Sequence, residues 1–434
     1  MTKKINIEIF KLSIPNIISN ISVPLLSTVD TILMGSLSNS HLAAVGLGSM
    51  LFNIIYWNFG FLRMGTTGIT AQYFGSKEND NIWLSFLRAG ILAVLLAILL
   101  VFFQVFLYDI CSWALNVGSD IDPLVKEYYG IRIWAAPASL LLMVVMGWFF
   151  GVQNAIYPLI LTIIINGINI IVSYYLVIYL GLGIRGVAIG TVIAQYFGLL
   201  VGFALIWYKY RSYVRLNIFS RLKQWSAYTR FLKINFDLFL RTVGLTFAFG
   251  FFYSQSSKIG NTVLAINVVL MQFVNWMSYG IDGFAFACES LVGKYKGAKN
   301  TSALKMVIRQ SFLWGGLVSF LYALVYYLAG SQLFQIFSSD ASLLLAAEGL
   351  LIYMAIFPII SFSSYIWDGI FIGLTATTSM RNAMLLALVI FIIFYYLQPG
   401  SLDGSHIWLA LCVFMIFRSI FQWMYYRKYG LNMS

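Results

Sequence analysis

One carboxylate inside an apolar segment is the residue of this sequence best suited to chemistry. Asp30 lies within the apolar stretch 23–35, and no other charged residue occurs between Lys11 and Arg63. An ionised carboxylate at membrane depth costs at least ~2.5–3.5 kcal/mol, so a protein that keeps one there generally uses it. The pKa of a desolvated carboxyl group can reach the neutral range. Asp30 therefore predicts a proton-coupling site, and the alternative is an Asp at a helix end satisfied by the loop 36–40.

Amide and hydroxyl side chains in the first half of the chain form a second polar group. Asn166, Asn169 and Ser173 follow one another at spacings of three and four residues, which places them on one face of a helix. Together with Gln195 they predict a polar cavity beside Asp30. Asn and Ser also form hydrogen bonds between membrane helices, and this interhelical role is the alternative.

The second half of the chain carries more charge inside its apolar segments. These residues are Asp237, Arg241, Asp282, Glu289 and Asp368. Asp237 and Arg241 are four residues apart, so we expect them to pair on one helix, while Asp282 and Glu289 share a face seven residues apart. Because pairing with Arg reduces the cost of burying an acid, we expect a polar cluster with a structural or substrate-handling role.

The elements that hold these residues must be membrane helices. The chain has 434 residues, of which 61% are hydrophobic and only 10% charged, against about 25% charged in soluble proteins. Apolar runs long enough to span a bilayer recur along it, and their continuity excludes the alternating strands of a β-barrel. Twelve spanning segments are predicted, with approximate cores at 8–34, 42–73, 83–108, 126–150, 156–180, 186–208, 235–257, 262–293, 303–329, 343–366, 379–398 and 406–427.

The positive charge is concentrated between these segments. The segment 209–233 holds seven basic residues and no acid, and a second basic cluster runs from Lys294 to Arg309. The positive-inside rule assigns both to the cytoplasm, together with both termini, in an inner (plasma) membrane protein. A phosphate-binding patch is the alternative, and we expect no nucleic-acid partner. Three scattered cysteines and two histidines predict no metal site and no cofactor.

An internal repeat divides the chain into two halves. A constant offset of 222 residues pairs Lys77 with Lys299 and the segment 147–151 with 369–373. Because both matches fall at predicted cytoplasmic helix ends, the halves run in the same direction. We therefore expect an all-α polytopic membrane protein with two six-helix lobes related by a pseudo-twofold axis along the membrane normal. The predicted parts are an N-lobe at 1–208, a basic linker at 209–233 and a C-lobe at 234–434.

Several motifs resemble those of one transporter family. They are Pro24, Asp30 and Gly35 in the first helix, and the segments 61–72, 235–242, 282–289, 368–373 and 380–382. Together they are similar to the DinF branch of the multidrug and toxic compound extrusion (MATE) family, over nearly the whole chain. The resemblance implies an antiporter that exports organic, often cationic compounds, with protonation of Asp30 releasing substrate. It also implies that Pro15 marks a bend in the first helix.

One departure from the family pattern affects the coupling ion. Ser173 stands where related transporters often have an Asp, so Asp30 would act without a second carboxylate. Sodium favours several oxygen ligands including carboxylate, which makes protons the expected coupling ion and sodium the alternative.

The sequence thus predicts a proton-coupled exporter of lipophilic, cationic organic compounds, acting as a monomer among membrane lipids. A flippase for a lipid-linked precursor is a second possibility, but such a cavity would need several cations, and only Arg63, Arg132 and Arg241 are candidates at depth. A membrane-embedded enzyme would need a His, Asp or Glu cluster near an interface, and none is evident. The pattern does not name the substrate.

Overall fold

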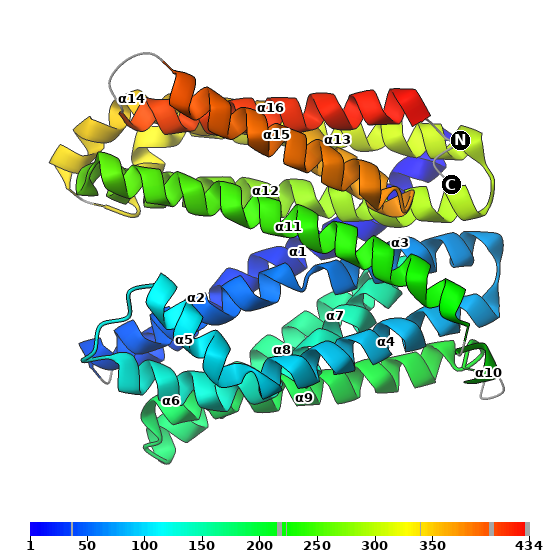
Figure 1. Ribbon diagram of the computed structural model, residues 1–434, viewed down its shortest axis with the longest axis horizontal. Helices are drawn as coiled ribbons and strands as arrows, with labels where there is room; N and C mark the ends of the chain where they lie inside the picture. The colour runs from blue at the N-terminus through cyan, green and yellow to red at the C-terminus, as the bar shows by residue number, and fades with distance from the viewer. Residues whose placement is uncertain (36–37, 215–218, 223, 339, 399–402, 430–434) are drawn as a thin grey trace. The chain divides into compact units, whose positions relative to one another are not determined.

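The chain is built from long helices. The computed structural model describes residues 1–434 apart from 36–37, 215–218, 223, 339, 399–402 and 430–434. Its description further omits the side chains of 23–32, 34–35, 219–220, 225–227 and 429. The described secondary structure is helical and contains no strand (Figure 1).

The helices follow the apolar segments of the sequence. The first ones are α1 (Thr2–Gly35), α2 (Asn39–Asn58), α3 (Phe61–Ser76), α4 (Asn79–Phe102), α5 (Gln104–Ala114), α6 (Asp122–Arg132), the 3-10 turn η1 (Ile133–Ala135), α7 (Ala136–Gly151), α8 (Ile156–Tyr174), the π-helical turn η2 (Tyr175–Tyr179) and α9 (Gly183–Tyr210). The remaining ones are α10 (Phe219–Leu222), α11 (Trp225–Ile259), α12 (Asn261–Gly297), α13 (Thr301–Gln335), α14 (Ala341–Gly373), α15 (Thr377–Leu397) and α16 (Gly404–Tyr429).

The number of long apolar helices confirms the membrane fold. Within the described residues, eleven helical segments are long and apolar enough to cross a bilayer. Helix α1 has 34 residues, which is more than the ~20 that a membrane span needs. The protein is therefore an all-α polytopic membrane protein.

Some helices differ from the predicted cores. The segment predicted at 42–73 is divided into α2 and α3, with a break at Phe59 and Gly60. Helix α11 begins at Trp225, inside the predicted linker 209–233. Hydropathy indicates only the apolar core of a helix. It therefore did not show that the basic residues before this core belong to the first turns of α11.

The described chain forms two compact units. The first unit is Ile18–Phe231, and the second unit is Leu232–Ser434 together with Met1–Ile17. Helix α1 therefore contributes to both units, whereas the sequence placed all of residues 1–208 in one lobe. Pro15 lies two residues before Ile17, where the second unit's part of α1 ends, and α1 is helical throughout Thr2–Gly35. The bend expected at Pro15 stays a prediction.

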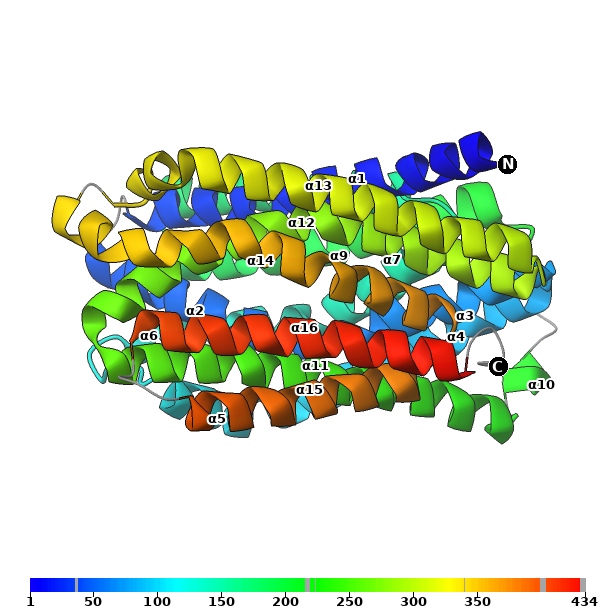
Figure 2. The same cartoon turned by 90° about the horizontal axis from the view of Figure 1, so that it is seen from above.

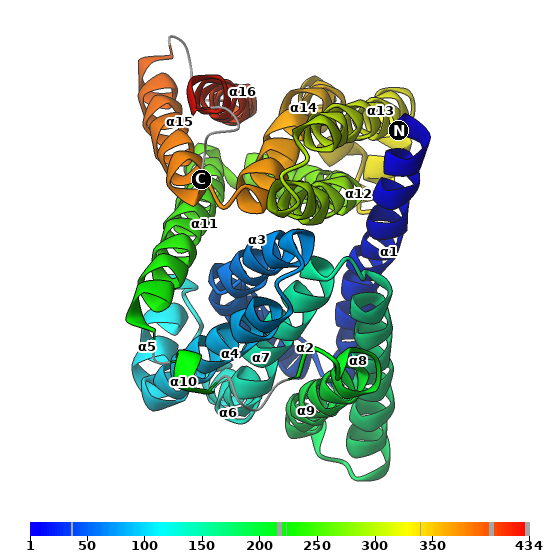
Figure 3. The ribbon, with the colours of Figure 1, turned by 90° about the vertical axis from the view of Figure 1, so that its right-hand side faces the viewer.

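Specific contacts hold the start of α1 in the second unit. The ring of Phe10 packs edge-on against Phe284 of α12 and Trp314 of α13, at centroid distances of 6.0 and 4.7 Å. Glu8 accepts hydrogen bonds from Lys294 Nζ and Tyr295 OH, both at 2.8 Å. Figure 3 shows the start of α1 beside α12 and α13. Helical periodicity identified α1 but carried no information on which half would bury it.

The 222-residue repeat appears as the same helix contact in each unit. A Cβ atom built on Gly147 of α7 would lie 2.4 Å from the carbonyl oxygen of Arg63 in α3. A Cβ atom on Gly369 of α14 would lie 2.3 Å from the carbonyl oxygen of Ala285 in α12. Each of these pairs is 222 residues from its counterpart, so both units cross two helices at a glycine because no larger residue fits.

The turns after these helices repeat as well. Lys77 and Lys299 adopt left-handed backbone conformations, with φ of 62° and 53°. Gln153 and Thr375 do the same, with φ of 64° and 52°. Both pairs keep the 222-residue offset, which confirms that the repeat is structural. In the second unit α12, α13, α14 and α16 run lengthwise beside one another (Figure 2).

Candidate transport site

The polar face of α8 packs against two neighbouring helices of the first unit. Asn166 Nδ2 donates to the carbonyl oxygen of Ser22 in α1 at 3.2 Å. Asn169 is 1% exposed, and its Nδ2 donates to Thr191 Oγ1 of α9 at 2.9 Å. Both amides form bonds between helices, which is the interhelical role considered for them.

Ser173 lies deeper in the same interface. It is fully buried, and a Cβ atom on Gly190 of α9 would come within 2.2 Å of its Oγ. Glycine at 190 thus lets α9 approach α8 closely enough to enclose the hydroxyl. Among the described residues, Ser173 Oγ and Asn169 Oδ1 have no hydrogen-bond partner. These two buried oxygens can therefore still accept a hydrogen bond. The fourth predicted cavity residue, Gln195, is half-buried on α9.

Asp30 belongs to α1, but its side chain lies outside the described residues. The neighbouring part of α1 is placed by contacts with α8. Ser19 Oγ donates to Thr162 Oγ1 at 2.9 Å, and Ser22 accepts from Asn166 as above. Both contacts advance along the two helices in the same direction, so these segments of α1 and α8 run parallel.

A cation also lies inside the first unit. Arg132 Nη1 donates to Tyr128 OH at 2.6 Å and to Ser49 Oγ at 3.2 Å. Its guanidinium carbon lies 4.8 Å from the centre of the Phe52 ring, within the range of cation–π attraction. Hydroxyl groups and aromatic rings therefore surround this charge.

Asp368 of α14 is the centre of a buried ion-pair group in the second unit. Its Oδ2 accepts hydrogen bonds from the guanidinium groups of Arg241 on α11 and Arg418 on α16. Its Oδ1 accepts from Gln422 Nε2 at 2.6 Å. The side chain of Arg418 is 1% exposed and that of Arg241 8%. These four residues, the Asp368 hub, join three helices through one carboxylate.

Asp237 forms a separate site, and its predicted pairing with Arg241 is wrong. Asp237 Oδ1 accepts from Arg381 Nη1 at 2.5 Å, and Oδ2 accepts from Thr378 Oγ1 at 2.6 Å and from Thr377 Oγ1 at 3.2 Å. Although they are four residues apart on α11, Asp237 faces the start of α15 and Arg241 faces α14 and α16. A same-helix pair is worth only ~0.2–0.5 kcal/mol, so better-placed neighbours from other helices decide the pairing.

The two remaining acids of the predicted cluster lie on α12. Glu289 is 1% exposed, and Asp282 is half-buried. Tyr365 of α14 lies within electrostatic reach of Asp282 and of the three charged residues of the Asp368 hub. The charged residues within reach of Tyr365 are therefore two acids and two arginines, whose formal charges cancel: Asp282, Asp368, Arg241 and Arg418.

Three residues of these ion-pair groups were not predicted from the sequence: Arg418, Gln422 and Arg381. Arg418 and Gln422 are four residues apart within the apolar helix α16. A charged residue inside an apolar segment is the signal that selected Asp30, so the same test applied to α16 would have found Arg418. Arg381 appears in the sequence near a helix start, where it is indistinguishable from an ordinary cytoplasmic charge.

A bundle of membrane-length helices that buries ionisable and amide side chains is the arrangement of a membrane transporter. A protein-family model, MatE, matches residues 15–175 and 239–397. The chain therefore belongs to the MatE family. The two matched segments correspond to the two halves of the internal repeat.

Relatives in several organisms resemble almost the whole chain. DNA damage-inducible protein F of Escherichia coli is 33% identical over 430 residues, covering 98% of this chain and 92% of the relative. Protein DETOXIFICATION 44, chloroplastic, of Arabidopsis thaliana is 25% identical and covers 96% and 81% of the two chains. A probable multidrug resistance protein NorM of Thermotoga maritima is 21% identical and covers 96% and 91%.

Solved structures share the fold. A MATE crystal structure in the bent conformation superposes with a TM-score of 0.88 at 19% identity, covering 98% of this chain and 96% of that one. An outward-facing multidrug resistance MATE transporter gives the same TM-score, identity and coverage. The family and its fold establish a general efflux-transporter role.

Proposed function

We propose that this protein exports lipophilic, cationic organic compounds in exchange for protons, with Asp30 as the proton-coupling carboxylate. Substrate would enter a mostly apolar pocket, and protonation of Asp30 would favour its release. The coupling ion is H⁺, no cofactor takes part, and the working unit is a monomer surrounded by membrane lipids. The names of the relatives, which refer to multidrug resistance and detoxification, support export of organic compounds.

The register of α1 against α8 is the observation that carries this proposal. The contact between Ser19 and Thr162 fixes the level of the two helices. Eleven residues further along each helix are positions 30 and 173, and eleven residues are close to three full turns. We therefore expect position 30 to lie at the level of Ser173. Position 30 shares the face of α1 that carries Ser19, and Ser173 shares the face of α8 that carries Thr162. The unused buried oxygens of Ser173 and Asn169 would accept a hydrogen bond from a protonated carboxyl group there.

The other unit supports the same choice by contrast. Asp237 is held by Arg381, and Asp368 is held by Arg241 and Arg418. Both of these carboxylates are therefore already engaged in ion pairs with arginines. In the first unit, by contrast, Asp30 lies in the apolar stretch 23–35, far along the sequence from any other charged residue.

The proposed location is the inner (plasma) membrane, with both termini and the linker 209–233 in the cytoplasm. Arg221 of this linker pairs with Asp80 at the start of α4 at 3.1 Å, which supports a position of the linker and the start of α4 on the same side of the membrane. Single cysteines at Ser38 and Ser226, in a background without native cysteines, test the orientation. An impermeant thiol reagent added to intact cells should label Ser38→Cys and spare Ser226→Cys, and the opposite pattern would refute it.

Transport by purified protein in liposomes tests the coupling. An imposed pH gradient should drive movement of a cationic dye by the wild type, and Asp30→Asn should abolish this movement while expression and melting temperature stay near normal. Asp109→Asn is the matched control, because it makes the same change at an exposed position of the first unit. Dye affinity of Asp30→Asn should also lose its dependence on pH.

Three results would contradict the proposal. Gradient-driven transport by Asp30→Asn at the wild-type rate would remove Asp30 from the coupling. Loss of pH dependence in Glu289→Gln or Asp368→Asn, but not in Asp30→Asn, would move the proton to the second unit. Transport driven by a sodium gradient at constant pH would establish the sodium alternative, and movement of a lipid-linked precursor in place of dyes would establish a flippase.

A further inference from the structure

An open groove runs along the surface of the second unit, between α14 and α16 with α13 at one end. Its volume is about 550 Å³, which lies in the ~300–1,000 Å³ range of small-molecule sites. Its α16 side carries exposed apolar side chains, such as Ile416 and Ile420, whereas on its α14 side Ile360 is half-buried and Trp367 is buried. The proposed transport chemistry uses none of the residues that line it.

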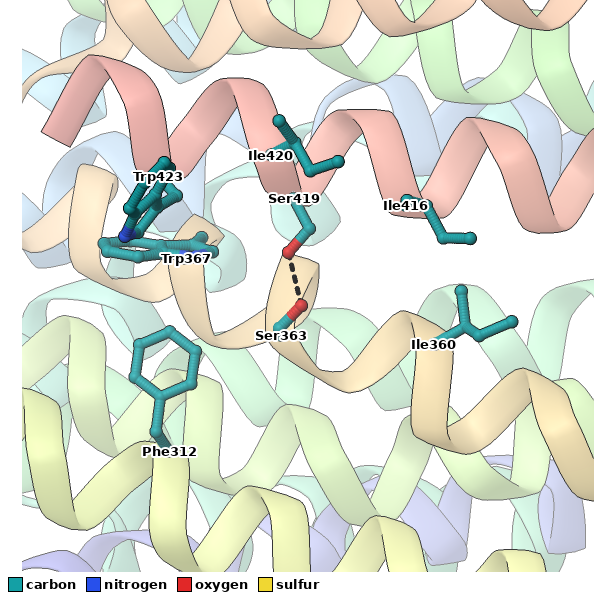
Figure 4. A pocket seen from close by; sticks show the side chains of 8 residues that line it. All are labelled: Phe312, Ile360, Ser363, Trp367, Ile416, Ser419, Ile420 and Trp423. Atoms are coloured by element: carbon teal, nitrogen blue, oxygen red, sulfur yellow. Dashed lines mark hydrogen bonds between the residues drawn. The ribbon is translucent and has the colours of Figure 1, made fainter. Parts of the chain in front are cut away.

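The side chains of the groove are ordered along its length (Figure 4). Ile360 and Ile416 face each other at one end. Ser363 and Ser419 form a hydrogen bond across the middle. The other end is aromatic and holds Phe312, Trp367 and Trp423. The groove thus changes from aliphatic to aromatic toward the end where α14 and α16 terminate.

Basic side chains continue this order beyond the aromatic end. The guanidinium carbon of Arg427 lies 5.0 Å from the centre of the Trp423 ring, one helical turn further along α16. On α13, Arg309 precedes Phe312 by three residues and is exposed, as is Arg427. Among the described side chains, neither arginine forms an ion pair with a carboxylate. Both guanidinium groups are therefore available to a ligand at this end.

Aliphatic, aromatic and basic groups in this order match one half of a lipid bilayer. Aliphatic side chains suit the hydrocarbon core, Trp residues concentrate at the level of the headgroups, and Lys or Arg at the surface attract anionic lipids. The basic end of the groove belongs to the side that charge asymmetry assigns to the cytoplasm. A neutral lipid would leave the two arginines without a counter-charge.

We propose that this groove is a binding site for an anionic phospholipid of the cytoplasmic leaflet. One acyl chain would lie between Ile360 and Ile416, and the acidic headgroup would meet Arg309 and Arg427. This assignment is independent of the proton site at Asp30.

The groove shares its two main helices with the Asp368 hub. Trp367 precedes Asp368 on α14, and Ser419 and Trp423 each follow a hub residue on α16. The hub therefore joins α14 and α16 on one face, and the bound lipid would join them on another. Occupancy should consequently stabilise the second unit against heat.

Lipid titration of the detergent-purified full chain tests this site. Phosphatidylglycerol should bind saturably and raise the melting temperature, and phosphatidylcholine with the same acyl chains should do so much less, as followed by native mass spectrometry and thermal unfolding. Arg309→Gln/Arg427→Gln should weaken phosphatidylglycerol binding roughly thirtyfold, or about fivefold per basic residue. Lys11→Gln/Lys258→Gln, which removes two exposed charges elsewhere in the same unit, should leave it unchanged.

A second variant tests the apolar end without altering charge. Ile360→Trp should fill the aliphatic part of the groove and weaken binding of both lipids. Equal binding of phosphatidylglycerol and phosphatidylcholine by the wild type would overturn the proposal. Full phosphatidylglycerol affinity in Arg309→Gln/Arg427→Gln would do the same, as would saturable binding of a cationic dye in the groove in place of the lipid.

Discussion

Neutralising Asp368 should destabilise the second unit strongly. In Asp368→Asn the guanidinium groups of Arg241 and Arg418 lose their shared carboxylate, although their side chains are only 8% and 1% exposed. Removing one partner of a buried ion pair costs ~3–5 kcal/mol, because the remaining charge stays buried without compensation. At ~2–4 °C per kcal/mol for domains of about this size, the apparent melting temperature should fall by roughly 6–20 °C.

Arg418→Gln should cost less than Asp368→Asn. Asp368 keeps Arg241 and Gln422 as partners in that variant, so what is lost is one charge-assisted hydrogen bond, of ~1.5–3 kcal/mol. The double variant should be less unstable than the sum of the two single changes, by a coupling of ~0.5–3 kcal/mol. Unfolding of detergent-purified protein, followed by tryptophan fluorescence at one fixed heating rate, gives the comparison.

Glu348→Gln is the control, since it removes an exposed acid from the same helix, and its melting temperature should stay within ~1–2 °C of the wild type. A melting temperature of Asp368→Asn equal to that of Glu348→Gln would refute the ion-pair hub. Strict additivity of Asp368→Asn and Arg418→Gln would show that the two side chains do not interact.

The remaining predictions concern packing, pairing and capping in the second unit. Gly369→Ala should destabilise by ~1–3 kcal/mol, because the added Cβ would lie 2.3 Å from a facing carbonyl oxygen, whereas Gly349→Ala, with open space around it, should be tolerated in the same unfolding assay. A double-mutant cycle should show coupling between Asp237 and Arg381, and additive effects would contradict the contact. Hydrogen bonds from the Ser342 hydroxyl, and then from the backbone N–H groups that follow Asp340, hold the pKa of Asp340 below its ordinary value. The stabilisation that the ionised Asp340 gives the folded state is complete above the ordinary pKa and is lost as the pH falls through the lowered pKa of the folded state. Asp340→Ala should therefore flatten this acid dependence of the melting temperature.

The sequence alone determined the class of this protein and much of its organisation. Apolar runs of membrane length leave few alternatives to a helical bundle, because backbone groups in lipid must find hydrogen-bond partners within their own segment. The 222-residue offset also paired the segments 147–151 and 369–373, and the structure shows Gly147 and Gly369 of these segments at equivalent helix crossings. These features depend on composition and on neighbours along one helix.

Partner choice between helices was decided only by the tertiary structure. The spacing of Asp237 and Arg241 predicted a pair, yet each bonds to a residue more than a hundred positions away along the chain. Likewise, no local pattern showed that residues 1–17 pack with the second half of the chain. A side chain in a bundle faces one neighbouring helix, and which helix stands there depends on the packing of the whole unit, whereas periodicity reports only that a face is buried.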